Sequence, residues 1–409
     1  MHIKRLALAI ATAAVATQAS AGGFALSEQS VSAGGTANAG RASHAMDASV
    51  VYGNPAAMVN LKQAQFTQAL AFIDASTKIS NATNAPAPAV PGSTNNGDIV
   101  PHTFVPSGYF TSGDQGGWAW GVAAYGSFGL KTNNEGTFAG RHLGDKSSVQ
   151  VITIQPALSY RVNDKVSVGF GPTFNRLDAY LSRAAGYGSA LTAEMEGDDI
   201  GYGYNAGVHV KLTPSTQAGV VYRSKVKYKI DDGDLTVKAG SAVAVPTASV
   251  STGISTPESV EASISHQLDA RTTLHAGATW TRWSRLKDLP ITSNATGAVV
   301  STEVFDWKDS VGYAVGITHA CTDKLELRAG LAYDNTPVAP EHRSVRLPSA
   351  DRRIASVGAG YKLSPSQTID VSYTYLDEEK AEVRQAATAY SADYKNKASI
   401  YGLQFTQKF

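Results

Sequence analysis

Basic side chains are the residues of this sequence best suited to hold a ligand, and seven of them fall on or beside segments of alternating polarity. They are Arg161, Arg176, Arg183, Arg223, Lys308, Arg328 and Arg352. A carboxylate in apolar surroundings needs a positive partner or several hydrogen-bond donors. Any of these residues that points inward could therefore pair with a carboxylate. Each of these residues could instead be a structural charge balanced by Asp or Glu, and an uncharged ligand would need none of them.

Motifs for other chemistry are weak. Gly201 and Gly203, followed by Gly207, lack the spacing of a dinucleotide-binding loop, and the sequence contains neither G-x-S-x-G nor H-E-x-x-H. The acidic run at residues 231–234 lacks the twelve-residue pattern and the closing Glu of a calcium loop. The single cysteine, Cys321, allows no internal disulfide and no Cys-based metal site. We therefore expect no enzyme activity, no cofactor and no metal.

Alternation of apolar with small or polar residues predicts that the basic side chains are carried on β-strands. Five such segments are residues 166–170, 208–212, 311–317, 325–333 and 369–374. The last twelve residues, 398–409, follow the same pattern and end on Phe409. A final strand with a terminal aromatic residue is typical of bacterial outer-membrane barrels, in which lipid lies outside.

Short turn signals divide the chain into pairs of strands. The six turns are residues 113–116, 163–164, 213–215, 269–271, 322–323 and 364–366, where Gly, Pro, Asn, Asp and Ser supply turn geometry. Six turns join seven up-and-down pairs. We therefore predict an all-β protein, a 14-stranded antiparallel transmembrane β-barrel that begins near Phe66 and ends at Phe409. We expect the long loops near residues 75–101, 130–147, 180–199, 231–256, 286–304, 336–350 and 381–396.

The first 21 residues have the features of a signal peptide. Lys4 and Arg5 precede an apolar run at residues 6–15, and Ala19-Ser20-Ala21 fits a cleavage site, so we expect the mature chain to begin at Gly22. No later stretch approaches about 18 consecutive apolar residues. Removing the signal peptide takes away two basic and no acidic residues, so the net charge of +1 becomes −1, which gives no indication of nucleic-acid binding. We expect export to the outer membrane of a Gram-negative cell.

Residues 22–60 do not follow the strand pattern. They are rich in Gly, Ala and Ser, with few bulky apolar side chains. Such a segment could be a disordered periplasmic tail or a plug folded into the lumen, and small residues permit the tight turns that a plug needs.

A family resemblance favours the plug over the disordered tail. Residues 23–28, Gly-Phe-Ala-Leu-Ser-Glu, followed by Asn54-Pro55-Ala56, resemble the mature N-terminus of the FadL/TodX family of outer-membrane channels for long-chain fatty acids or hydrocarbons. Further matches occur in order along the chain, at residues 128–130, 156–160, 167–171, 221–224, 328–334, 347–348 and 351–352. The resemblance implies a 14-stranded barrel, residues 61–409, plugged by an N-terminal hatch, residues 22–60. It also implies passive transport: capture in surface loops, transfer to an inner site closed by the hatch, and lateral exit through the barrel wall.

Two short segments are candidates for gating. In Asn54-Pro55-Ala56, Pro55 fixes φ and Asn54 can bond neighbouring backbone, so the segment is either an ordinary turn or, as the resemblance implies, a turn that braces a kinked strand. The expected kink lies at residues 124–129. Its two glycines permit a bulge or a bend, and an unpaired strand edge in lipid must be covered by protein or used as an opening. The gating candidates are Asn54, Pro55, Ala56, Tyr125, Gly126, Phe128 and Gly129.

The ligand candidates rest on the resemblance. Phe24 and Leu26 are named because the mature N-terminus of the family lies close to the bound ligand, and Arg183 and Lys308 because they align roughly with family regions near it. We expect most other aromatic side chains to form lipid-facing girdles. This set is Phe104, Tyr109, Phe110, Trp118, Trp120, Trp280 and Trp283.

The leading hypothesis is thus a monomeric channel in outer-membrane lipid for a long-chain fatty acid or another hydrophobic small molecule. The nearest alternative keeps the channel and changes the cargo to monoaromatic or other hydrocarbons. Two alternatives come from other classes. An outer-membrane enzyme needs a catalytic triad or dyad at the outer rim, and a surface receptor needs much longer loops.

Overall fold

The protein is an all-β barrel with a small helical segment at its N-terminus. The computed structural model describes residues 23–84, 99–186, 189–239, 243–244, 248–385 and 390–409, so the expected signal peptide lies outside the described residues. The strands are β1 (Gln65–Asn84), β2 (Thr103–Thr111), β3 (Trp118–Asn133), β4 (Lys146–Arg161), β5 (Val166–Ala184), β6 (Leu191–Lys211), β7 (Thr216–Arg223), β8 (Val226–Ala239), β9 (Val243–Ala244), β10 (Ala248–Thr256), β11 (Ser259–Gln267), β12 (Thr272–Thr281), β13 (Asp288–Ser293), β14 (Val299–Val304), β15 (Ser310–Ala320), β16 (Leu325–Asp334), β17 (Arg352–Ser364), β18 (Gln367–Glu378), β19 (Ala381–Gln385) and β20 (Tyr390–Lys408).

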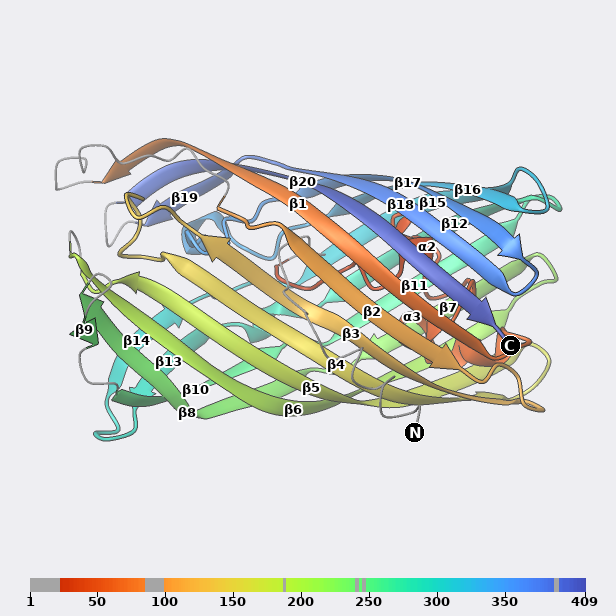
Figure 1. Ribbon diagram of the computed structural model, residues 1–409, viewed down its shortest axis with the longest axis horizontal. Helices are drawn as coiled ribbons and strands as arrows, with labels where there is room; N and C mark the ends of the chain where they lie inside the picture. The colour runs from red at the N-terminus through yellow and green to blue at the C-terminus, as the bar shows by residue number, and fades with distance from the viewer. Residues whose placement is uncertain (1–22, 85–98, 187–188, 240–242, 245–247, 386–389) are drawn as a thin grey trace.

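These segments form fourteen wall strands. Five consecutive pairs, β7 with β8, β10 with β11, β12 with β13, β14 with β15, and β18 with β19, are each two parts of one strand, and the two-residue β9 only pairs with β8. Neighbours are antiparallel, and β1 pairs with both β2 and β20, which closes the barrel (Figure 1). Closure leaves no sheet edge for lipid to meet, apart from the gap described below. The predicted fold class is confirmed.

The short turns lie at one end of the barrel and the longer loops at the other. All six predicted short turns are confirmed, because each lies between the end of one strand and the start of the next: β2 and β3, β4 and β5, β6 and β7, β11 and β12, β15 and β16, β17 and β18. The long loop predicted at residues 180–199 is wrong, since β5 and β6 stay paired as far as Ala184 and Thr192. Strand pairing also runs into the loops predicted near residues 75–101, 231–256, 286–304 and 381–396. These upper ends carry polar residues, so a search for apolar alternation does not detect them.

The outer surface carries the apolar band expected of a lipid-facing wall. Phe104, Trp118 and Trp120 are exposed there, as predicted. Tyr109 and Trp283 are buried, so the girdle assignment is wrong for these two side chains. Among the described residues, no helix is long and apolar enough to cross a membrane.

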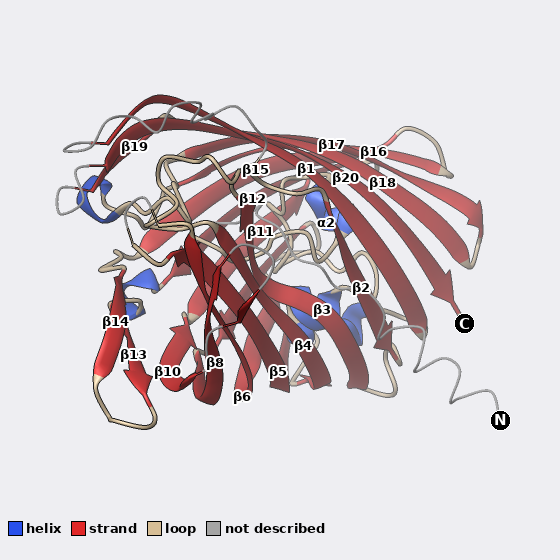
Figure 2. Cartoon of the chain, turned by 60° about the vertical axis from the view of Figure 1, so that its left-hand side comes forward, coloured by secondary structure: helices blue, strands red, loops and turns tan. Residues whose placement is uncertain are grey.

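The N-terminal segment fills part of the lumen (Figure 2). It contains α2 (Val31–Gly34), α3 (Val50–Gly53) and the 3-10 helix η1 (Pro55–Asn60); two further 3-10 turns, η2 (Trp283–Arg285) and η3 (Pro340–His342), lie between later strands. We call residues 23–61 the plug, and most of them are buried. Wall glycines permit its close approach. A Cβ on Gly219 would lie 1.9 Å from the carbonyl oxygen of Ala42, and one on Gly207 would lie 2.0 Å from Oδ1 of Asn54.

Candidate functional site

The barrel wall has a gap between β2 and β3. All of β2 pairs with β1, but only residues 108–111 of β2 pair with β3, opposite residues 121–124. Beyond Ala124, β3 continues to Asn133 with β4 as its one partner among the described wall strands, and its register with β4 shifts between Gly126 and Phe128. The structure thus places the irregularity of β3 within the segment that the sequence marked as a kink.

The start of the plug covers the free edge of β3. Ala25 forms an isolated antiparallel bridge with Phe128. The backbone N–H of Leu26 donates to the carbonyl oxygen of Ser127 at 3.1 Å, and the N–H of Gly129 donates to the carbonyl oxygen of Phe24 at 2.9 Å. Unpaired backbone groups are costly next to lipid, and this short strand supplies the partner that β3 lacks at its free edge.

Gln29 spans the gap itself and was not predicted. Its side-chain amide donates to the carbonyl oxygen of Gly126 on β3 at 2.9 Å. The backbone carbonyl oxygen of Gln29 accepts two hydrogen bonds from β2, one from the Tyr109 hydroxyl at 2.6 Å and one from the Ser107 hydroxyl at 3.2 Å. Gln29 is 1% exposed. It directly follows the Gly23–Glu28 run, so its position was the one available signal.

Asn54 fastens a different part of the plug. Its side-chain amide donates to the carbonyl oxygens of Ala42 at 2.8 Å and Val208 at 3.0 Å, and its Oδ1 accepts from the N–H of Ala56. Pro55 begins η1, where its fixed φ suits the first helical position. The hydrogen bonds of Asn54 therefore run within the plug and to β6 rather than to the kinked segment of β3.

An apolar cavity lies in the barrel half opposite the short turns, with Phe24 among its lining residues. Its empty volume is about 1000 Å³, counting its open mouth. The lining includes Leu130, Val149, Leu177, Ile230 and Trp307. The ring centroid of Phe24 lies 5.0 Å from that of Trp283 and 5.7 Å from that of Phe128, so Phe24 links the cavity to the free edge of β3. Leu26 lies elsewhere, in a buried apolar cluster that includes Val105.

One buried cation lines this cavity, and it is Arg346. Its Nη1 donates to the carbonyl oxygen of Lys146 and the hydroxyl of Ser147, while its Nε has no hydrogen-bond partner among the described residues. Burial lowers the pKa of Arg346, nearby Glu303 opposes the shift, and Arg183 adds to it. Arg346 was missed because it lies in the loop between β16 and β17, where alternation gives no information.

The predicted basic ligands lie outside this lining. Arg183 donates to Ser301 at 3.1 Å and is near enough to act on Arg346. Lys308 is exposed, next to the cavity residue Trp307. The remaining candidates pair with acids, as the alternative interpretation expected: Arg161 with Asp114, Arg176 with Asp178 and Asp198, Arg223 with Glu261, Arg328 with Asp370 and Glu326, and Arg352 with Glu378.

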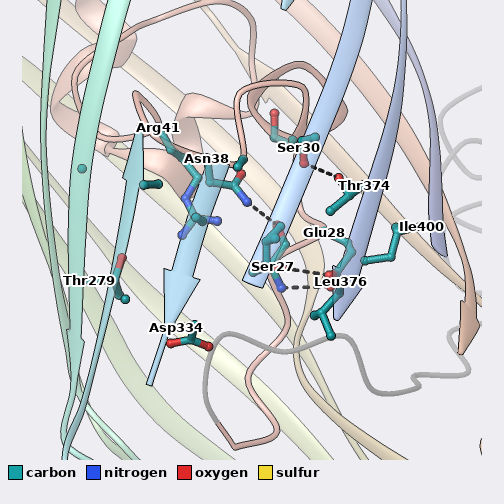
Figure 3. Close-up of a pocket in the computed structure, with 18 of the residues that line it drawn as sticks. Ser27, Glu28, Ser30, Asn38, Arg41, Thr279, Asp334, Thr374, Leu376 and Ile400 are labelled. Atoms are coloured by element: carbon teal, nitrogen blue, oxygen red, sulfur yellow. Dashed lines mark hydrogen bonds between the residues drawn. The ribbon is translucent and has the colours of Figure 1, made fainter. Parts of the chain in front are cut away.

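A second cavity separates the plug from the wall on the side of β11 to β20, and Figure 3 shows its lining. Glu28 is buried there and accepts hydrogen bonds from the backbone N–H and the hydroxyl of Ser27 at 2.9 and 2.8 Å. Burial raises the pKa of Glu28 from its usual 4.5 to about 7. In the part of the chain that the structure describes, no group of three or more His, Cys, Asp or Glu side chains could hold a metal ion.

The closed barrel, the internal plug and the covered gap define the class of an outer-membrane transport channel. The sequence matches the family model described as outer membrane protein transport protein (OMPP1/FadL/TodX) over residues 12–409. The chain belongs to this family. With its apolar cavity, it is an outer-membrane transporter of hydrophobic compounds and not an enzyme.

Individual relatives agree over nearly the whole chain. The long-chain fatty acid transport protein of Escherichia coli O6:H1 is 27% identical and outer membrane protein P1 of Haemophilus influenzae is 29% identical, each with 98% of both chains covered. A crystal structure of a Pseudomonas aeruginosa FadL homologue is 24% identical, with a TM-score of 0.85 and coverage of 95% of this chain and 100% of that one. The Pseudomonas putida toluene transporter TodX is 16% identical, with a TM-score of 0.67 and coverage of 90% and 95%. The two structures show a shared fold.

Proposed function

We propose that this protein carries long-chain fatty acids across the outer membrane by passive diffusion. The observation that supports the acid is Arg346, a buried guanidinium with one unpaired N–H group at an otherwise mostly apolar cavity. Apolar walls suit a hydrocarbon chain, at about 25 cal/mol per Å² removed from water, and the guanidinium suits a carboxylate. The name of the Escherichia coli relative agrees with this cargo.

The route follows the three features of the site. Cargo enters from the loop end, rests in the apolar cavity against Phe24, and leaves into outer-membrane lipid through the gap between β2 and β3. Exit requires residues 24–29 to leave the edge of β3, so the plug is the gate. Three hydrogen bonds between plug and β3 backbone hold it closed, two from the backbone and one from Gln29. Three hydrogen bonds, at about 0.5–1.5 kcal/mol each, can break by thermal motion, so opening needs no energy source. A single chain closes the barrel, which suits a monomer.

The second candidate cargo is a monoaromatic hydrocarbon. Several lining residues of the cavity are apolar and suit such a ligand, namely Leu130, Val149, Leu177, Ile230 and Trp307. Such a ligand would leave Nε of Arg346 without a hydrogen-bond acceptor.

Uptake of labelled oleate and labelled toluene tests these proposals. The host is an outer-membrane-competent strain that lacks its own fatty-acid channel, compared with and without this protein. Faster oleate uptake alone supports the fatty-acid proposal, and faster toluene uptake alone replaces it with the hydrocarbon. If the protein is inserted in the outer membrane and neither compound enters faster, the transport proposal for both cargoes is wrong.

A further inference from the structure

A third cavity lies behind the short strand that covers β3, and polar side chains line much of it. Its empty volume is about 720 Å³, open solvent included. Ala25 and Leu26 form one side, and Tyr125 and Ser127 of the kinked segment form another. Arg223, the last residue of β7, lines the cavity from the barrel wall. The cavity thus adjoins both the plug and the gap, and the fatty-acid route described above assigns no role to it.

The charge of this cavity is unbalanced. Arg41 of the plug binds Glu261 of β11 through Nε at 3.0 Å and Nη2 at 2.8 Å. Arg223 of β7 binds the same carboxylate through Nη1 at 2.9 Å. Both guanidinium groups also lie over the ring of Tyr52, at 5.2 and 4.4 Å from its centroid. Two cations therefore share one anion in a buried cluster.

Each of these cations keeps a free donor. Nη1 of Arg41 and Nε of Arg223 are buried and have no hydrogen-bond partner among the described residues. A buried donor without a partner costs about 1–3 kcal/mol, and more when the group is charged. A carboxylate or another anion that entered this cavity would supply the missing acceptors and balance the charge.

A chain of polar side chains connects the cavity to the free edge of β3. The Thr153 hydroxyl lies 2.9 Å from that of Ser127, on the kinked segment, and 2.7 Å from Oδ1 of Asn175. The hydroxyl of Tyr125 donates to Gln155 at 2.8 Å, and Asn205 donates to the same oxygen at 2.7 Å. A polar head can therefore stay solvated by protein up to the gap, where an alkyl chain meets lipid.

We propose that this cavity is a second ligand subsite, in which Arg41 and Arg223 hold the carboxylate of a long-chain acid while its alkyl chain leaves tail first between β2 and β3. The nature of the cargo rests on the proposed function. The subsite separates the entry of the alkyl chain into lipid from the release of the carboxylate. The alkyl chain enters lipid first, while the carboxylate still keeps its polar partners, so a charged group is not left without partners in apolar surroundings.

Crystals grown with 2-bromohexadecanoate test the proposal directly, since bromine next to the carboxylate marks the head by its anomalous signal. We expect bromine beside Arg346 and beside Arg223 in the wild type, and loss of the second position in Arg223→Gln. Bromine beside Arg346 alone in the wild type overturns the subsite and leaves the proposed function standing. Bromine in neither cavity contradicts both.

Uptake rates provide a second test. Arg223→Gln should slow oleate uptake about tenfold, since a hydrogen bond to a charged group is lost, whereas Arg223→Lys keeps the charge and most of the rate. Arg223 also donates to the plug carbonyls of Tyr52 and Gly53, each at 3.2 Å. Arg161→Gln is the matched control, because Arg161 likewise donates to a plug carbonyl, that of Val59, away from this cavity. Unchanged uptake in Arg223→Gln, or an equal loss in Arg223→Gln and Arg223→Lys, overturns the proposal. Heat-modifiable migration in gels checks that each barrel is folded.

Discussion

The side-chain amide of Gln29 donates a 2.9 Å hydrogen bond to the carbonyl oxygen of Gly126, at the point where β3 shifts its register and is no longer paired with β2. The backbone carbonyl of the same Gln29 accepts from Tyr109 and Ser107 on β2. One plug residue thus joins the two strands whose own pairing has ended. Its side chain is the simplest point at which to loosen the contact between the plug and β3.

Gln29→Ala should therefore speed uptake. The variant leaves a buried carbonyl without its partner and removes one of the three bonds between the plug and the β3 edge, at about 1–3 kcal/mol, so we expect oleate uptake to rise several-fold or more. Initial rates of labelled oleate uptake measure the effect. Gln115→Ala is the control, because the side-chain amide of Gln115 donates to the carbonyl oxygen of nearby Ser112, in a short turn away from the gap. Equal rates in Gln29→Ala and the wild type would show that this bond does not limit opening.

Asn54→Ala should loosen the middle of the plug from β6, because the carbonyl oxygens of Ala42 and Val208 lose their partner. Gly207→Ala should do the same from the other side, since its Cβ would lie 2.0 Å from Oδ1 of Asn54. Hydrogen exchange of the plug amides measures the loosening, and we expect faster exchange in both variants.

Gly253→Ala is the matched control for Gly207→Ala, because its Cβ meets only a backbone oxygen at 3.7 Å. If Asn54→Ala exchanges as slowly as the wild type, Asn54 does not hold the plug, and the gating prediction for Asn54-Pro55-Ala56 fails with it.

The docking of the plug should weaken as pH rises from about 4.5 to about 7. Burial raises the pKa of Glu28 to about 7, so over this range the docked plug binds more protons than an undocked one. The contribution is fully present below pH 4.5, is lost through pH 7 and is on the order of 3 kcal/mol. Glu28→Gln should remove this dependence. We therefore expect the ratio of wild-type to Glu28→Gln oleate uptake to rise with pH. Taking the ratio cancels the effect of the ionisation of oleate, which is the same for both proteins. A constant ratio would contradict the prediction.

Arg346→Gln should weaken binding of oleate about tenfold and leave toluene unaffected, since only the acid uses the charge. Quenching of tryptophan fluorescence by a brominated fatty acid measures binding, because Trp307 lines the cavity. Arg353→Gln, an exposed arginine paired with Glu379, is the control. Equal binding by Arg346→Gln and the wild type would remove Arg346 as the carboxylate partner.

The barrel was predictable because its signals are local. Apolar alternation marks the lipid-facing half of each strand, and Gly, Pro, Asn, Asp and Ser mark the short turns, so strand number and order follow from a linear pattern. The irregularity of β3 was predictable for the same reason, from two glycines in one strand. Upper strand ends such as residues 191–199 gave no signal, because a strand that lies outside lipid needs no apolar face.

The site residues were harder to predict because they are brought together from distant parts of the sequence. Arg346 reaches the cavity from a loop without periodicity, and its partners at Lys146 and Ser147 lie about 200 positions away. Gln29 acts through one side-chain bond to a residue 97 positions away. Arg183 and Lys308 were chosen by alignment of segments, which locates a region of the wall but not the direction in which a side chain points.

The length of β6 has a consequence for what encloses the cavity. Its closely spaced exposed apolar residues run from Val208 to Ile200. The strand continues upward through nine more residues, a rise of about 20 Å for a tilted strand, and Leu191 at the far end is the one large apolar side chain of this extension that is exposed. Met195, Glu196 and Gly197 of that extension line the apolar cavity. Part of the cavity wall is therefore built from strand beyond the closely spaced apolar band of β6. An apolar molecule in the cavity would there be enclosed by protein instead of by hydrocarbon, and lengthening or shortening these upper strands would change the depth of the enclosure.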